Sequence, residues 1–388
     1  MVSARAGRWL RRVAAVAITL VVVLLIVATW AYCGQIDGRL LRTGPLPSEY
    51  DLEVLAVEGG VVTLPYGTAA ERPGVWGLEW ATGYARVGAV VSVTPEGVQR
   101  PLLEVAGTLR PGTMVLVDPL AYESDPGDAG VQYENVIVEG PLGNYPAWRT
   151  EGADDTWVIL VHGRGSSRRE ALRVLPTLVA GGFPTLTITY RNDPGAPGGG
   201  GRYGLGNPEW RDLAAAVEYA ADEGAADVVL MGYGMGGAIS TLFLQESAQA
   251  TLVRALVLDA PLLDAGATVD ADARAHNVPG LIVGWAKGLA TLRFGVDWGD
   301  LNQVEHLGAL EVPVLLFHGT GDPEAPVEAS DRFARLHPGL VRYERVEGEG
   351  RAASWNADPA RYQAALAAFL DEVAAGPAPE PATLPAEG

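Results

Sequence analysis

Three short glycine-rich motifs each follow a stretch that is predicted to be a buried strand. They are Val161-His162-Gly163-Arg164-Gly165, Gly232-Tyr233-Gly234-Met235-Gly236-Gly237 and Phe317-His318-Gly319-Thr320-Gly321-Asp322. In a parallel sheet the carboxyl ends of the strands meet at one edge, and ligands bind there. The sequence therefore predicts that the three motifs converge on one binding or catalytic site.

The second motif lies between a predicted strand and a predicted helix and has the form Gly-x-Gly-x-Gly at residues 232–236. A turn of this kind can reflect ordinary close packing. Together with the other two motifs, however, it makes residues 131–374 resemble the α/β-hydrolase superfamily, in particular membrane-anchored bacterial members related to serine esterases and peptidases. In that superfamily the turn reads Gly-x-Ser-x-Gly and exposes a nucleophilic serine. The resemblance places Gly234 at the position of this serine.

The resemblance also indicates the other two members of a catalytic triad. The acid of the family follows a late strand, and Asp322 matches it. The family's histidine often follows Gly-x-Gly, and here the segment Gly348-Glu349-Gly350 is followed by Arg351. The nucleophile, acid and base positions are therefore Gly234, Asp322 and Arg351, and only the acid position carries the family's residue type.

These residue types have direct chemical consequences. Glycine has no side chain, so no acyl-enzyme can form at Gly234. Arg351 keeps its proton at ordinary pH and cannot be a general base. The backbone N–H groups of Arg164 and Met235 could still form an oxyanion hole, because this role needs no particular side chain. Such a site accelerates hydrolysis by only on the order of 10³–10⁴ over water, so we predict a catalytically inactive protein.

Arg351 is expected to pair with Asp322. Burial of an uncompensated carboxylate is costly, and a guanidinium can bind a carboxylate through two parallel hydrogen bonds. The alternative is that Arg351 turns toward Gly234. Its charge and the oxyanion-hole N–H groups would then form a site for a small anion such as a carboxylate.

Other polar residues near the motifs are interpreted as structural. Roles as helix caps, loop supports or inward-packed groups are expected for Ser166, Ser167, Ser240, His162, His318 and His337. Ser354 is the alternative candidate for a substitute nucleophile. The Gly198–Gly201 run lacks the context of a phosphate loop and is interpreted as a flexible loop. No metal-ligand spacing and no cofactor motif are found.

Strands and helices alternate after about residue 131. Strands are expected at 131–139, 144–150, 157–161, 185–190, 227–231, 256–258 and 314–317, and helices at 168–180, 210–223, 236–247 and 328–336. This alternation predicts an α/β fold with a doubly wound, mostly parallel sheet in residues 131–374. Residues 262–310, with helical patterning, are expected to be a lid, and the Pro-, Ala- and Glu-rich tail 375–388 to be disordered.

The N-terminal third is predicted to contain a membrane anchor and a β-rich accessory domain. Residues 13–33 include an uncharged run of about 20 residues, enough to span roughly 30 Å of hydrocarbon. Four arginines in residues 1–12 predict a cytoplasmic N-terminus and an extracytoplasmic C-terminal domain at the cell membrane. A cleaved signal peptide is the alternative. Cys33 is interpreted as an apolar filler, with lipidation as the alternative.

Residues 34–130 show short strand patterns between Gly and Pro residues. Leu52–Val57 and Val61–Leu64 are expected to form a hairpin, and further strands are expected at 89–93 and 114–117. The segment contains no histidine and no cysteine after Cys33. We interpret it as a domain for packing or positioning.

Composition limits the classes of function. Hydrophobic residues make up 48% of the chain and charged residues 19%, and the net charge is −19. Nucleic acid is therefore a poor partner. The preferred hypothesis is a membrane-anchored, catalytically inactive α/β-hydrolase-type protein that serves as a binding or scaffolding module for a small anionic or acyl ligand. The alternatives are an active serine-type hydrolase of esters or amides with a non-standard nucleophile, and a purely structural protein.

Overall fold

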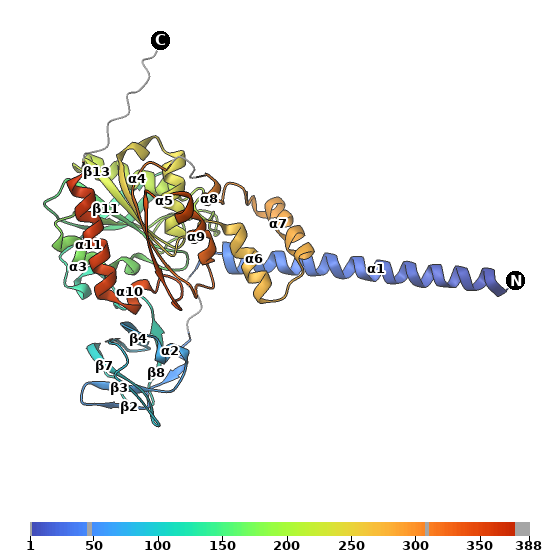
Figure 1. Cartoon of the computed structure of the whole chain (residues 1–388), viewed down its shortest axis with the longest axis horizontal. Coiled ribbons are helices and arrows are strands. Elements are labelled where there is room, and N and C mark those ends of the chain that lie inside the picture. Colours follow the sequence, from blue (N-terminus) through green and yellow to red (C-terminus); the bar gives the residue numbers. More distant parts are fainter. Residues whose placement is uncertain (1, 45–48, 307–309, 377–388) are drawn as a thin grey trace, which may run out of the picture.

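The computed structural model of the chain describes residues 2–44, 49–306 and 310–376. A long N-terminal helix, a small β domain and a larger α/β domain follow one another along the chain (Figure 1). The prediction of a disordered tail at 375–388 concerns residues that, from 377 onward, lie outside the described ranges.

The α/β domain is built on one sheet with the strand order β16-β15-β14-β13-β11-β12-β10-β9. Its strands are β9 (Glu134–Gly140), β10 (Gly143–Thr150), β11 (Thr156–Val161), β12 (Thr185–Thr187), β13 (Asp227–Tyr233), β14 (Val253–Asp259), β15 (Val314–Gly319) and β16 (Val341–Val346). The neighbours from β12 to β16 pair in parallel, while β9 and β10 add an antiparallel hairpin at one edge. The predicted mostly parallel α/β fold is confirmed.

Helices cover both faces of this sheet. Alternate residues of the central strands point to opposite faces, so Ile159 and Val161 pack in one core and Val158 and Leu160 in the other. The first core includes residues of α4 (Trp210–Asp222), α5 (Met235–Glu246) and α9 (Val327–Leu336), and the second includes residues of α3 (Leu175–Ala180) and α11 (Pro359–Ala375). The loops at the carboxyl ends of the strands are left to form a site.

Two predicted elements differ from the structure. The helix expected at 168–180 is a 3-10 helix, η3 (Arg168–Arg173), followed by the short α3. Pro176 explains the break, because proline is tolerated in the first turn of a helix but not in its interior. The strand expected at 185–190 ends at Thr187, and β16 was not predicted because its residues are only partly buried.

The segment expected to be a lid contains three helices in its described part. It contains α6 (Ala265–Ala275), α7 (Gly280–Phe294) and α8 (Gln303–His306). The aspartate Asp264 caps α6 by accepting a hydrogen bond from the N–H of Ala267. α6 and α7 stand away from the sheet and lie beside the N-terminal helix (Figure 1).

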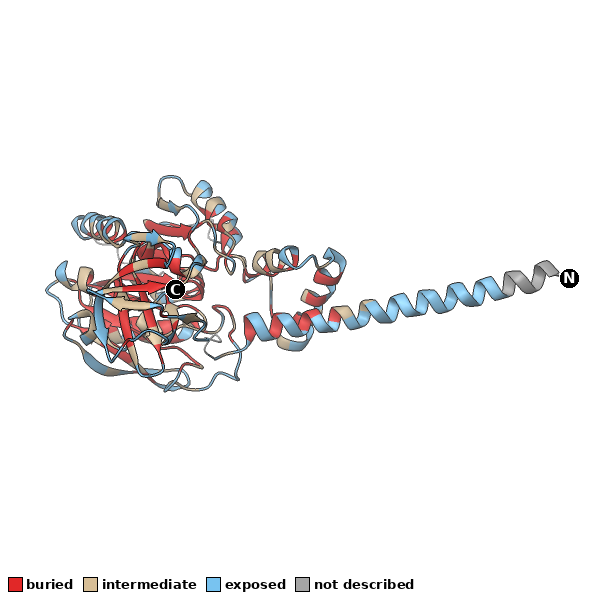
Figure 2. Cartoon of the chain, turned by 90° about the horizontal axis from the view of Figure 1, so that it is seen from below, coloured by how far each residue is buried: buried red, intermediate tan, exposed pale blue. Residues whose placement is uncertain are grey.

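The N-terminal helix α1 (Val2–Ile36) is long and apolar enough to cross a membrane. Figure 2 shows that most of its described residues are exposed and project from the molecule, whereas residues at its C-terminal end are buried. Tyr32, Cys33 and Ile36 belong to a core of the α/β domain, and the short η1 (Asp37–Leu41) continues this contact. The interpretation of Cys33 as a buried filler fits this position.

The β domain forms an antiparallel sheet with the order β1-β8-β4-β5-β7-β3-β2, in which β6 pairs with β7. Its strands are β1 (Leu52–Glu53), β2 (Ala56–Glu58), β3 (Val61–Leu64), β4 (Trp76–Trp80), β5 (Gly83–Val87), β6 (Ser92–Thr94), β7 (Gly97–Ala106) and β8 (Met114–Asp118). The expected hairpin is present as β2 and β3. The first part of the expected strand, Leu52–Glu53, instead pairs with β8. The strand expected at 89–93 is wrong in its bounds, because β6 begins only at Ser92.

Candidate active site

The strand-to-helix turn at Gly234 connects β13 directly to α5. Gly234 has φ 50° and ψ −112°, a conformation that residues with a side chain adopt only at a cost in strain. The turn is also closely packed: a Cβ on Gly236 would lie 2.0 Å from the carbonyl oxygen of Val161. The sequence thus forms the sharp turn that the resemblance implies, with a glycine at its apex.

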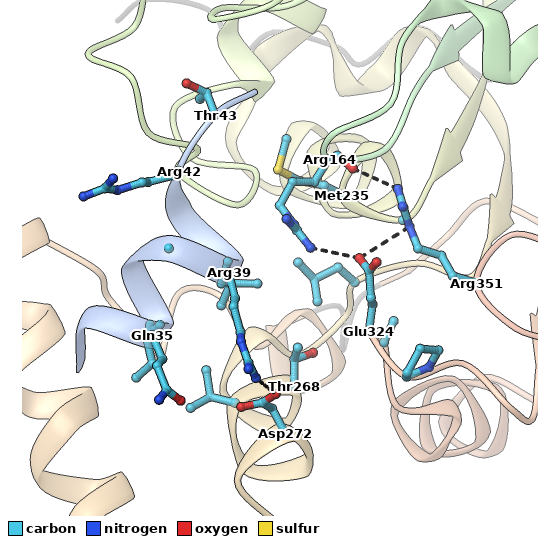
Figure 3. Close-up of a pocket in the computed structure, with 18 of the residues that line it drawn as sticks. Gln35, Arg39, Arg42, Thr43, Arg164, Met235, Thr268, Asp272, Glu324 and Arg351 are labelled. Atoms are coloured by element: carbon cyan, nitrogen blue, oxygen red, sulfur yellow. Dashed lines mark hydrogen bonds and ion pairs between the residues drawn. The ribbon is translucent and has the colours of Figure 1, made fainter. Parts of the chain in front are cut away.

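Arg351 lies over this apex. A Cβ built on Gly234 would be 3.6 Å from Arg351 Nε and 3.8 Å from its Nη2. Arg351 Nη2 donates a hydrogen bond of 3.0 Å to the carbonyl oxygen of Arg164, and its Nε lies 3.6 Å from Glu324 Oε2 (Figure 3). The structure therefore brings residues 164, 234 and 351 together, as the motifs predicted.

The expected ion pair between Arg351 and Asp322 is wrong. Asp322 Oδ1 instead accepts hydrogen bonds from the backbone N–H groups of Glu324 at 2.7 Å and Ala325 at 3.0 Å. The aspartate thus forms a local turn with the backbone that follows it, and one of its two oxygens is satisfied there. Glu324, two residues further on, reaches into the pocket and takes the place of Asp322 as the partner of Arg351 (Figure 3).

The remaining oxygen of Asp322 is buried. Asp322 Oδ2 lies 3.6 Å from His318 Nε2 and accepts no hydrogen bond from any residue that the structure describes. His318 itself is held by Ser330 Oγ at 2.7 Å and the carbonyl oxygen of Ala325 at 3.0 Å. This agrees with a structural role for His318.

Glu324 neutralises part of the positive charge at the site. Its Oε2 accepts a hydrogen bond of 2.9 Å from Arg164 Nη2 as well as facing Arg351. Burial alone would lower the pKa of Arg351, but the carboxylates of Glu324, Glu170 and Asp322 outweigh this effect and raise it. Arg351 is therefore a permanent cation beside Gly234, and it cannot accept a proton.

The expected oxyanion donors line the same pocket. Neither the N–H of Arg164 nor that of Met235 donates to another described residue, whereas the neighbouring Gly163 N–H is bound by Glu170 Oε2 at 2.7 Å. Both groups thus remain available to an acceptor on a ligand. The carbonyl oxygen of Arg164, in contrast, is already engaged by Arg351.

The pocket above Gly234 has a volume of about 530 Å³. One part of its wall comes from the first two motifs, from residues 323–325 directly after the third motif, and from Arg351. The other part comes from the end of α1, η1 and α6, with residues such as Ile36, Leu40 and Val269. Arg39 of this wall is paired with Asp272 at 2.9 Å (Figure 3). Sequence reasoning assigned α1 to the membrane only, because a hydropathy pattern does not show that a helix end will be buried against a distant lid.

A buried network of charged residues lies beneath the strand-to-helix turn at Gly234 and was not predicted. Arg173, only 1% exposed, donates to the carbonyl oxygen of Ala352 at 2.7 Å and faces Glu170 at 3.9 Å. Asp259 at the end of β14 accepts a hydrogen bond of 3.0 Å from the hydroxyl of Tyr362. Burial raises the pKa of Asp259 to about 6, although Arg173 opposes the shift.

The loop that carries Arg351 is fixed by the β domain. Asn356 Nδ2 donates to the carbonyl oxygens of Val75 at 2.8 Å and Pro119 at 2.9 Å, and the N–H of Val75 donates back to Asn356. These contacts tie the segment that follows Arg351 to the β domain, for which a role in packing or positioning was predicted.

Several other candidates occupy the structural positions expected of them. Ser167 caps η3, Ser240 binds the carbonyl oxygen of Gly236 at 2.9 Å, and His337 is the C-terminal cap residue of α9. His162 is buried and bound to Asp193 at 2.8 Å. Ser354, the candidate substitute nucleophile, is 4% exposed and does not line the pocket.

Two segments of the chain match known protein families. Residues 152–294 match the family described as serine aminopeptidase, S33, and residues 53–118 match a domain of unknown function, DUF8805. A search of curated protein sequences gives no match.

Solved structures of the esterase Pf2001 from Pyrococcus furiosus share the fold. In one crystal form the identity is 20%, with 64% of this chain and 96% of the esterase covered and a TM-score of 0.52. In another form the identity is 19%, with 64% and 94% covered and a TM-score of 0.52. The chain thus has an α/β-hydrolase fold. Its α/β domain is similar to serine aminopeptidases and esterases.

Proposed function

We propose that the chain is a membrane-anchored α/β-hydrolase-fold protein without hydrolytic activity, which binds a ligand in the pocket above Gly234. The observation that carries this proposal is the guanidinium of Arg351, which lies over the glycine at the nucleophile position. A site with neither a nucleophile nor a base there cannot form or break down an acyl-enzyme.

The ligand that we propose is an acyl chain whose polar end is a hydrogen-bond acceptor or an anion. The positive charge of the pocket is compensated only in part, because Arg164 and Arg351 share the single carboxylate of Glu324, while Arg39 pairs with Asp272. The wall contributed by α1, η1 and α6 combines the apolar residues Ile36, Leu40 and Val269 with polar and charged ones. An acyl chain would contact this wall, and its carbonyl oxygen could accept from the N–H groups of Arg164 and Met235.

Anchoring through α1 is the second part of the proposal. Residues from Val13 to Trp30 form the uncharged part of α1 and are largely exposed, and four arginines precede them in the sequence. A cleaved signal peptide would leave the chain before or near Cys33. The burial of Tyr32, Cys33 and Ile36 in the α/β domain supports an uncleaved helix instead.

The rival function is an active hydrolase with a non-standard nucleophile, and the match to serine aminopeptidases favours it. The decisive experiment is to treat the purified full-length protein in detergent with a fluorophosphonate and, separately, with p-nitrophenyl esters of short and medium chain length. We expect no covalent labelling and only background hydrolysis. Stoichiometric labelling, or turnover that Arg351→Ala abolishes, would establish the rival.

Ligand binding is tested separately from catalysis. A fluorescent fatty acyl probe should bind the full-length protein, and Val269→Arg, which replaces one of the apolar residues of the wall by a charged one, should weaken binding. The matched control is Val341→Arg in β16, a partly buried valine outside the pocket. Equal affinity of both variants would locate the probe elsewhere.

A further inference from the structure

The lid helix α7 has an unusual distribution of side chains. It has 15 residues, and its only charged residues are Lys287 and Arg293. A helix that is apolar around most of its circumference is either buried in protein or in contact with lipid. α7 is buried on one side only.

The buried side of α7 faces the protein and includes Ile282, Val283, Ala286 and Ala290. These residues share a core with the C-terminal end of α1. Arg293 links the two helices, since its guanidinium lies 4.2 Å from the ring centre of Trp30.

The opposite side of α7 is apolar and exposed. Leu281, Trp285 and Leu292 are 56%, 47% and 85% exposed. With Gly288 they are spaced by four, three and four residues, so they form one stripe along the helix. No described residue covers this stripe.

Both charged residues of α7 are engaged by protein groups beside the stripe. Lys287 Nζ lies 2.6 Å from Asp270 Oδ1 and donates to the carbonyl oxygen of Gly266 at 2.8 Å. Arg293 lies over Trp30 and Phe294. The stripe itself therefore carries no charge that would need water.

We infer that α7 lies in the outer interface of the lipid bilayer, with Leu281, Trp285 and Leu292 turned toward the acyl chains. The argument for lipid as the occupant is continuity: α7 packs on α1 at Trp30, where the exposed apolar surface of α1 begins. A helix of 15 residues is about 22 Å long and too short to span the hydrocarbon. Tryptophan and an apolar stripe are typical of helices in the interface.

This inference deepens the proposed function and rests on its anchoring step. If α7 lies in the interface, the neighbouring α6 and the end of α1 place their part of the pocket wall at the level of the lipid headgroups. Gln35 lines the pocket and Val27 is an exposed residue of the apolar part of α1. They are eight residues apart, so the pocket wall begins about 12 Å along the helix from the apolar part. The ligand of the pocket would then be an acyl-chain amphiphile drawn from the bilayer.

The test uses single cysteines in the full-length chain, reconstituted in vesicles of phosphatidylcholine and phosphatidylglycerol at 3:1. Cys33 is fully buried, so the unmodified chain gives the labelling blank. Trp285→Cys and Leu292→Cys receive an environment-sensitive fluorophore, and quenching by lipids with a nitroxide at shallow or deep acyl positions is measured. Leu20→Cys on α1 is the positive control.

Leu336→Cys is the matched negative control. Leu336 is 53% exposed and ends α9, which returns from the site to the opposite edge of the sheet, where β16 begins. We expect shallow-lipid quenching at residues 285 and 292, deep-lipid quenching at residue 20 and none at residue 336.

Two results would overturn the inference in different ways. Quenching at residue 20 without quenching at 285 and 292 would refute the interfacial position of α7 and leave the anchor intact. If residues 285 and 292 are protected from aqueous iodide but are not quenched by lipid, the interfacial position of α7 is also refuted. The stripe is then covered by protein. Absence of lipid quenching at residue 20 would refute the anchor and, with it, the inference.

Discussion

Replacing Gly234 by serine and Arg351 by histidine tests the assignment of the site most directly. The structure has room for the serine, because the nearest atom to a Cβ at residue 234 is Arg351 Nε at 3.6 Å, an ordinary contact. The backbone conformation is the obstacle: with φ 50°, a serine there should cost about 1–3 kcal/mol of stability. Gly234→Ala should show the same loss, which separates strain from chemistry.

The activities of the single and double variants should differ strongly. Gly234→Ser alone places a hydroxyl beside the permanent cation of Arg351, where no group can accept its proton, so it should stay near background. Adding Arg351→His supplies a base, which is worth roughly 10²–10⁴ in rate. Asp322 Oδ2, which no described residue engages by a hydrogen bond, is the acceptor that could orient this histidine.

Hydrolysis of p-nitrophenyl butyrate by the full-length protein in detergent measures this difference, and fluorophosphonate labelling counts the reactive serines. The double variant should exceed Gly234→Ser by at least about 10²-fold, and adding Asp322→Asn should remove most of the gain. A folded double variant no faster than Gly234→Ser would refute the assignment of residue 351 to the base position.

Three further predictions follow from topology and burial. Protease added to spheroplasts should remove the domains that follow α1, and their full protection would contradict the proposed orientation. Burial disfavours the ionised form of Asp259 and raises its pKa to about 6, so its penalty is absent below about pH 4 and complete above about pH 6. In denaturant titrations Asp259→Asn should therefore gain up to about 3 kcal/mol relative to wild type between pH 4 and pH 7, and a pH-independent difference would contradict the shift. Arg173→Met should lower the free energy of unfolding by about 3–5 kcal/mol because it leaves Glu170 buried without its cation, whereas Arg342→Ala, which breaks the exposed pair with Glu372, should cost about 1 kcal/mol or less.

The fold was accessible from the sequence because local signals agree with the global arrangement. Continuous apolar runs such as Trp157–Val161 become fully buried parallel strands, and glycine-rich turns mark the ends of the strands that converge on the site. The prediction failed where burial is incomplete or proline intervenes. β16 alternates between partly buried and exposed residues, and the helix expected at 168–180 is interrupted before Pro176.

The motifs predicted which segments lie close together, but not the contacts that their residues make. The motifs placed Gly234, Arg164 and Arg351 together correctly. They could not show that the turn after β15 satisfies Asp322 from its own backbone, which frees Arg351 to face Glu324. Nor does any local pattern reveal that the end of α1 forms a wall of the pocket, because this contact joins residues more than 200 positions apart in the sequence, as between Tyr32 and Val269 at 3.1 Å.

The residues at 234 and 351 suit each other physically, and this supports binding over catalysis. The glycine in the strand-to-helix turn relieves backbone strain and lets the guanidinium of Arg351 approach the turn. The guanidinium then binds the carbonyl oxygen of Arg164 and so holds the loop of residue 351. The β domain holds the same loop through Asn356. The floor of the pocket is thus fixed by contacts that need no ligand. What can still select a ligand is the opposite wall, formed by the end of α1 and the lid. If the proposed function is correct, the residues that select the ligand lie near the membrane, at the edge of the α/β domain. An acyl chain can enter the pocket there directly from the bilayer.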